Sequence, residues 1–131
     1  MPQCDILIEF QPFYKTQYPL FLFCSPTYPE LVQQVLATHT EGHCSEGTEI
    51  ELIFDIQRNR YLVVHIGWEG EKRTYGTMIH VDIKDGKIWI QRDFTEEGIP
   101  NQLVDLGVPK TDIVLGFRAP HIRQFTGFAE G

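Results

Sequence analysis

The chain has 131 residues, of which 42% are hydrophobic and 22% are charged, and its formal net charge at pH 7 is −7. This length and apolar content predict one globular domain with a substantial core and argue against a disordered chain. Because the overall charge is negative, attraction to a phosphate backbone would have to come from a local basic patch, so nucleic-acid binding is disfavoured at the outset.

The three cysteines, Cys4, Cys24 and Cys44, are odd in number and form no CxxC pair. They argue against a disulfide framework and a four-thiolate zinc site, and they favour a reducing, cytoplasmic location. The apolar run at 18–25 is short and interrupted by prolines. We therefore predict neither a signal peptide nor a membrane span.

Residues 1–26 differ in character from the rest of the chain. The stretch "DILIEF" alternates like a short strand, but Pro12, Pro19 and Pro26 interrupt the residues after it. We predict an N-terminal extension or arm over 1–26 and an α+β domain over 27–131.

The first element of that domain is a predicted helix from about Tyr28 to His39. Thr27 is suited to cap its free amides, Pro29 lies in its first turn, and Glu30 comes after the cap at capping-box spacing. The residues predicted on its apolar face recur at three-and-four spacing: Tyr28, Leu31, Val32, Val35, Leu36 and His39.

From Glu49 the apolar period changes to two, which indicates β-strands. Turn signals, including Asp85-Gly86, separate four predicted antiparallel strands at 49–57, 60–68, 73–83 and 88–93. After them come a predicted short helix at 99–107 and a brief strand at 113–117. The predicted fold is α+β: an antiparallel four- to five-stranded sheet, one N-terminal helix, a short C-terminal helix and a packed C-terminal tail.

Pairing the strands through their turns predicts which residues share a face of the sheet. A two-residue loop at Arg58 and Asn59 would place Phe54 opposite Val63, and the later turns extend that face. Its predicted members are Leu52, Phe54, Tyr61, Val63, His65, Gly76, His80, Trp89 and Gln91. The other predicted face holds Leu62, Val64, Ile66, Trp68, Tyr75, Ile79, Val81, Ile83, Ile88 and Ile90. Both faces are too apolar to be left in water, so a second helix, the arm, the tail or another subunit must cover one of them.

His39, His43 and Cys44 have the spacing of zinc ligands if the first helix continues through Gly42. No acidic residue lies between the histidines in the HExxH manner, and Gly42 is expected to end the helix. A structural or incidental role is the stronger interpretation.

His65, His80 and Asp82 form a second polar candidate, because two histidines and a carboxylate near one strand pair could shuttle protons or hold a metal. A core histidine bonded to a neighbour is the commoner outcome for His65. The chain carries no nucleophile elbow, phosphate-cradling glycine loop or paired-carboxylate arrangement. We predict no catalytic residue, no cofactor and no metal.

The C-terminal stretch "FRAPHIRQFTGFAEG" concentrates aromatic and basic residues. Arg92, Arg118, His121 and Arg123 could form a basic patch with aromatic neighbours suited to stacking on bases, although tail arginines more often bind backbone carbonyls. We predict that Phe117, Phe125 and Phe128 dock on the domain. Together with Phe125 and Phe128, the residues Arg92, Arg118, His121 and Arg123 are the predicted interaction surface.

The stretches "HIGW", "HVDIKDGKIWIQ", "TEEGIPNQLVDLGVPKTDIVLGF" and "RQFTGFA" resemble the XisI family, the fdxN-element excision controlling factors. The resemblance covers about eighty residues and implies a single α+β domain. It also implies an accessory part in programmed excision of a DNA element during differentiation of nitrogen-fixing cells (heterocysts). In that system a separate recombinase breaks and joins the DNA, and the family acts beside an endonuclease-fold partner called XisH.

Three functional hypotheses are open on these grounds. The leading one is a protein-interaction module that regulates an XisH-like partner. The second is direct DNA binding through Arg92, Arg118 and Arg123, and the third is a metal-dependent hydrolase. A homo-oligomer, such as a dimer, is also expected, because an uncovered apolar sheet face often pairs with its own copy.

Overall fold

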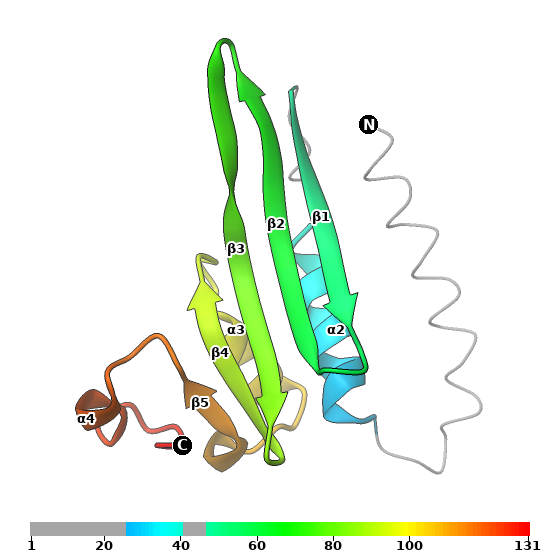
Figure 1. Ribbon diagram of the computed structural model, residues 1–131. Helices are drawn as coiled ribbons and strands as arrows, with labels where there is room; N and C mark the ends of the chain where they lie inside the picture. Colours follow the sequence, from blue (N-terminus) through cyan, green and yellow to red (C-terminus); the bar gives the residue numbers. More distant parts are fainter. Residues whose placement is uncertain (1–25, 41–46) are drawn as a thin grey trace.

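The computed structural model describes residues 26–40 and 47–131 (Figure 1). The predicted extension therefore lies, except for Pro26, outside the described residues, as do His43 and Cys44. Within the described part of the chain, no helix is long and apolar enough to cross a membrane.

One five-stranded sheet, with helices behind it, forms the body of the molecule (Figure 1). The strand order is β1-β2-β3-β4-β5; β1 to β4 are antiparallel neighbours and β5 pairs with β4 in parallel. The elements are α2 (Tyr28–Thr38), β1 (Thr48–Asp55), β2 (Arg60–Glu69), β3 (Lys72–Lys84), β4 (Lys87–Asp93), α3 (Ile99–Asp105), the 3₁₀ turn η2 (Lys110–Asp112), β5 (Ile113–Leu115) and α4 (Pro120–Arg123). The predicted α+β class is confirmed.

Helix α2 begins where its cap signals predict. The backbone N–H of Thr27 donates to Oε2 of Glu30 at 3.2 Å, which is one half of a capping box. The helix ends one residue before the predicted end, and His39 is its C-cap. Its apolar stripe packs on the sheet, since Val32 and Leu36 are fully buried.

The core lies between the helices and one face of the sheet, here called the helix face. Its strand members are buried or half-buried and come from all five strands: Ile50, Leu52, Phe54, Tyr61, Val63, Ile79, Val81, Ile83, Ile88, Ile90, Ile113 and Leu115. The end of β4 is bonded to the start of α3, because Asp93 Oδ2 accepts the N–H of Ile99 at 2.8 Å and so satisfies a free amide of the first turn.

A β-bulge in β3 overturns part of the predicted face assignment. Val63 pairs with Ile79 but Val64 pairs with Thr77, so Met78 is an extra residue. The alternation of faces therefore reverses at this point in β3. Ile79, Val81, Ile83, Ile88 and Ile90, predicted for the opposite face, join the helix face. His80 and Trp89, predicted beside Tyr61 and His65, lie on the opposite face. Gln91 is the extra residue of a second bulge, in β4, and it bonds to Asp82 on that opposite face.

The turn between β1 and β2 also differs from its prediction. Asp55 pairs with Arg60, so the loop has four residues, and Phe54 lies opposite Tyr61 where Val63 was predicted. Oδ1 and Oδ2 of Asp55 accept the N–H and a guanidinium N–H of Arg58, each at 3.1 Å, and these bonds hold the pKa of Asp55 below its usual value. Because the slip is two residues, the faces are unchanged.

Candidate interaction surfaces

The C-terminal segment is anchored at the β5 edge of the sheet. The N–H of Ala129 donates to the carbonyl of Ile113 at 2.8 Å, and Ala129 forms an isolated parallel bridge with Val114. Phe128 packs against the core, as predicted, with Lys110 Nζ 5.7 Å from its ring centroid. The packed tail of the predicted fold is therefore present, and it pairs with the sheet edge.

The prediction that Phe117 and Phe125 dock on the domain is wrong. Phe125 is 77% exposed and Phe117 is 45% exposed, one on each side of the short helix α4. The same segment carries the 40%-exposed Ile122 and the exposed Arg118 and His121, and we call these five exposed residues the C-terminal patch. Exposed aromatic and arginine side chains of this kind are typical of protein interfaces.

Arg123 does not belong to that exposed surface. Its Nε donates to the carbonyl of Arg118 at 3.0 Å and its Nη2 to that of Gly116 at 3.4 Å. Its guanidinium carbon lies 5.4 Å from the ring centroid of Trp89. Arg123 therefore links parts of the tail to one another and to β4. Bonding to backbone carbonyls is the role that the sequence analysis favoured for a tail arginine.

Arg92 lies on β4, opposite His80, with its guanidinium carbon 4.2 Å from the centroid of the exposed Phe94. The cation–π contact of Arg92 is therefore made with Phe94, the first residue after β4. Of the predicted interaction residues, Arg118, His121 and Phe125 fall in one exposed patch, whereas Phe128 packs on the core and Arg123 is bonded within the tail.

The predicted polar set His65, His80 and Asp82 is split by the sheet. His65 is on the helix face, opposite Ile50 and Gly76, and His80 and Asp82 are on the other face. There, Nε2 of His80 is 3.0 Å from Oδ1 of Asp82, and Gln91 donates to Oδ2 at 3.4 Å. Among the described residues, no group of three His, Cys, Asp or Glu side chains is placed to hold a metal ion.

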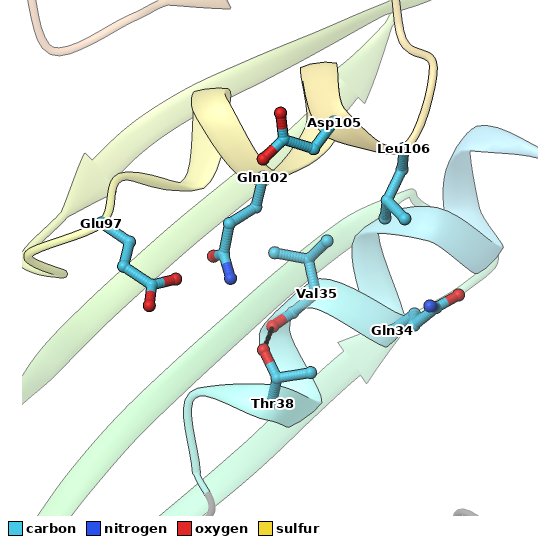
Figure 2. A pocket seen from close by; sticks show the side chains of 7 residues that line it. All are labelled: Gln34, Val35, Thr38, Glu97, Gln102, Asp105 and Leu106. Carbon is cyan, nitrogen blue, oxygen red and sulfur yellow. Dashed lines mark hydrogen bonds between the residues drawn. The ribbon is translucent and has the colours of Figure 1, made fainter.

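A cleft of about 280 Å³ lies between α2 and α3 (Figure 2). Its lining residues are Gln34, Val35, Thr38, Glu97, Gln102, Asp105 and Leu106. At its edge His39, predicted as a weak ligand candidate, hydrogen-bonds through Nε2 with Oε1 of Gln102. Two of these described lining residues are acidic and none is basic, so the lining is not suited to bind an anionic substrate. The cleft had no signal in the sequence, since it arises only where α2 and α3 pack against each other.

The long β2–β3 hairpin presents a second exposed surface, away from the helices (Figure 1). Trp68 is 52% exposed and Tyr75 is 69% exposed. The guanidinium carbon of Arg73 lies 5.2 Å from the Trp68 ring centroid and 5.9 Å from that of Tyr75. The predicted strands 60–68 and 73–83 are consecutive in the chain, and a four-residue loop between them places Arg73 opposite Trp68, as observed. This cluster could therefore have been found from the sequence.

These features define a small α+β protein with one mostly antiparallel sheet, a helix-covered face, an exposed face and aromatic side chains displayed at both ends. The model of the XisI family, described as XisI protein, matches residues 25–130. The chain therefore belongs to the XisI family, and the resemblance found in its sequence is confirmed.

Two solved structures from Anabaena variabilis are similar to this chain. A XisI-like protein is 43% identical with a TM-score of 0.75, and the match covers 78% of this chain and 94% of that chain. The fdxN element excision controlling factor XisI is 34% identical with a TM-score of 0.71, and the match covers 79% of this chain and 96% of that chain. No protein of curated function matches the chain.

Proposed function

We propose that the protein is an accessory controlling factor for the excision of a DNA element, acting as a regulatory binding module while a separate enzyme breaks and joins the DNA. The family membership supports this proposal, as does the similar structure described as an excision controlling factor. The observation that carries it is the C-terminal patch, which presents Phe117, Ile122 and Phe125 to solvent within one short segment.

The partner we propose is an XisH-like protein of endonuclease fold, bound at the C-terminal patch. Burying a side chain as exposed as Phe125 would give such an interface an aromatic anchor. Arg118 and His121 beside it would form a polar rim suited to acidic groups on the partner. The hydrogen bonds of Arg123 within the tail hold the segment in shape before binding, which lowers the entropic cost of association.

Co-expression of the full chain with an XisH-like protein tests this proposal. We expect the two proteins to elute as one complex at micromolar concentration. Phe125→Ala should weaken the complex about tenfold or more, because truncating a central aromatic anchor costs more than about 1.4 kcal/mol. Ile56→Ala is the matched control, since Ile56 is 61% exposed but lies in the β1–β2 turn. Separate elution of the wild-type proteins would refute the proposal.

Direct DNA binding receives less support from the same residues. The guanidinium N–H groups of Arg123 are bonded to backbone carbonyls, and the chain carries a net charge of −7. We therefore expect no electrophoretic shift of DNA by the isolated protein at low salt. A shift whose affinity falls steeply with added salt would instead favour a phosphate-binding role.

A further inference from the structure

The face of the sheet opposite the helices, here called the open face, is arranged in columns of different chemistry. Its β2 positions are Leu62, Val64, Ile66 and Trp68, an apolar ridge in which Val64 is buried, Leu62 and Ile66 are half-buried and Trp68 is exposed. The C-terminal segment reaches only the β4 and β5 side of this face, where Val114 is fully buried and pairs with both Trp89 and Ala129. The ridge on β2 ends in the exposed Trp68.

The column on β1 is acidic. Its open-face residues are Glu49, Glu51, Ile53 and Asp55, as the pairing with β2 requires. Glu49 and Glu51 are exposed, and within residues 26–40 and 47–131 neither has an ion-pair partner, whereas Asp55 is paired with Arg58. Two carboxylates at neighbouring open-face positions beside an apolar ridge attract a cationic group.

The column on the other side of the ridge carries the positive charge. Arg73 faces Trp68, and the exposed Lys84 and Arg92 continue this side along β3 and β4. Asp82 is the one acidic residue among the open-face positions that the structure describes on β3 and β4, and it is engaged by His80 and Gln91. The open face is therefore divided along β2 into a negative half and a positive half.

We propose that two copies of this chain associate open face to open face, with a two-fold axis running along β2. Rotation about this axis reverses the order of the strands across the sheet and leaves positions along the strand direction unchanged. The acidic β1 column of each copy therefore lies over the β3 column of the other. Glu49 is level with Ile66 and Tyr75, one row from Arg73. Glu49 of each copy thus approaches Arg73 of the second copy, and the two Trp68–Ile66 ridges pack at the centre.

The charges also distinguish this arrangement from pairing at the β1 edge. In an antiparallel β1–β1 ladder with the faces aligned, Glu49 would lie opposite Glu49, Glu51 or Asp55, or Glu51 would lie opposite itself, according to the register. Like charges directly opposite one another destabilise a ladder. Face-to-face packing instead places unlike charges together and buries the exposed Trp68 and Tyr75 rings. The acidic column also repels a nucleic-acid backbone, so a second copy fits this face better than DNA does.

Sedimentation of the full chain with charge-reversed variants tests the proposal. We expect wild-type dimers at micromolar concentration. The single variants Glu49→Lys and Arg73→Glu should each raise the dimer dissociation constant about tenfold or more, because each creates two repulsive contacts per dimer. Mixing these two variants should restore association as a heterodimer. One contact then joins the two substituted side chains, lysine against glutamate, and the other joins the unchanged Glu49 and Arg73. Trp68→Ala should weaken association with no such rescue.

The matched controls are Glu96→Lys and Lys110→Glu, which make the same charge changes at exposed positions outside the open face. Both should leave the dimer unchanged, and circular dichroism should confirm that every variant is folded. A wild-type chain that stays monomeric at high micromolar concentration would overturn the proposal. So would a dimer insensitive to Glu49, Arg73 and Trp68, or folded variants that form no heterodimer. If the open-face variants lose dimerisation but still bind the XisH-like protein, the self-association proposed here and the proposed function are independent of each other.

Discussion

At the scale of single residues, Tyr28 links the first helix to the last part of the fold. Its hydroxyl donates to Oδ2 of Asp112 in η2, and this bond, with smaller contributions from burial and from the negative charge of Asp112, raises the pKa of Tyr28 to about 12. We expect Tyr28→Phe to lower the free energy of unfolding by about 1 kcal/mol at neutral pH, because the bond to the carboxylate is lost at a partly exposed site.

The same pair predicts a pH dependence with a definite sign. The pKa of Tyr28 is raised in the folded protein, so its contribution is complete below the unfolded value of about 10 and is lost as pH rises through about 12. The stability difference between wild type and Tyr28→Phe should therefore shrink from about pH 10 upward in urea titrations. Tyr75→Phe, which changes an exposed tyrosine, is the control. A difference that stays constant up to about pH 12 would contradict the prediction.

Phe128 and Phe125, three residues apart, should respond in opposite ways to truncation. Phe128 packs on the core, so Phe128→Ala should cost about 2 kcal/mol, roughly half the value for a fully buried phenylalanine. Phe125 is 77% exposed, and Phe125→Ala should change stability by less than about 0.5 kcal/mol. Thermal unfolding of both variants checks this, and equal losses would show that Phe125 also packs on the domain.

At the scale of elements, local signals predicted α2, α3 and the five strands, because each has a cap, a turn residue or an apolar period of its own, whereas the short helix α4 was not predicted. Register was harder. The extra residue Met78 leaves no mark in the sequence, yet it moves Ile79, Val81 and their neighbours to the other face. Met78 packs against the core, so the position of the bulge depends on tertiary packing and cannot be located in a sequence that is read strand by strand.

Gly67 shows a close approach between elements that a variant can measure. A Cβ at Gly67 would lie 2.2 Å from the carbonyl oxygen of Gly47, which accepts the N–H of Trp68 at 2.8 Å. Gly67→Ala must therefore displace backbone, and we expect a loss of about 2 kcal/mol or more. Gly76→Ala meets only the His65 ring, at 3.2 Å, and is the control on a neighbouring strand. Similar melting temperatures for the two variants would contradict this.

At the scale of the whole molecule, the sequence predicted the C-terminal patch only in part. Arg118, His121 and Phe125 were identified from composition, but the burial of Phe128 and the internal bonds of Arg123 depend on where α4 places the segment against β5. The split of His65 from His80 follows from the bulge, and the cleft between α2 and α3 from tertiary packing. The sequence thus identified candidate residues more reliably than it identified the contacts that those residues make.

The two proposed surfaces lie at different ends of the sheet, with the hairpin end at the top of Figure 1 and α4 at its lower edge. Sites far apart with no shared contacts contribute additively to binding energies. We therefore expect Trp68→Ala to weaken self-association but leave partner binding unchanged, and Phe125→Ala to do the reverse. The double variant should show both losses at their single-variant sizes, within about 0.5 kcal/mol. Measuring both equilibria for all four proteins checks this, and a coupling larger than that would mean that one surface acts through the other.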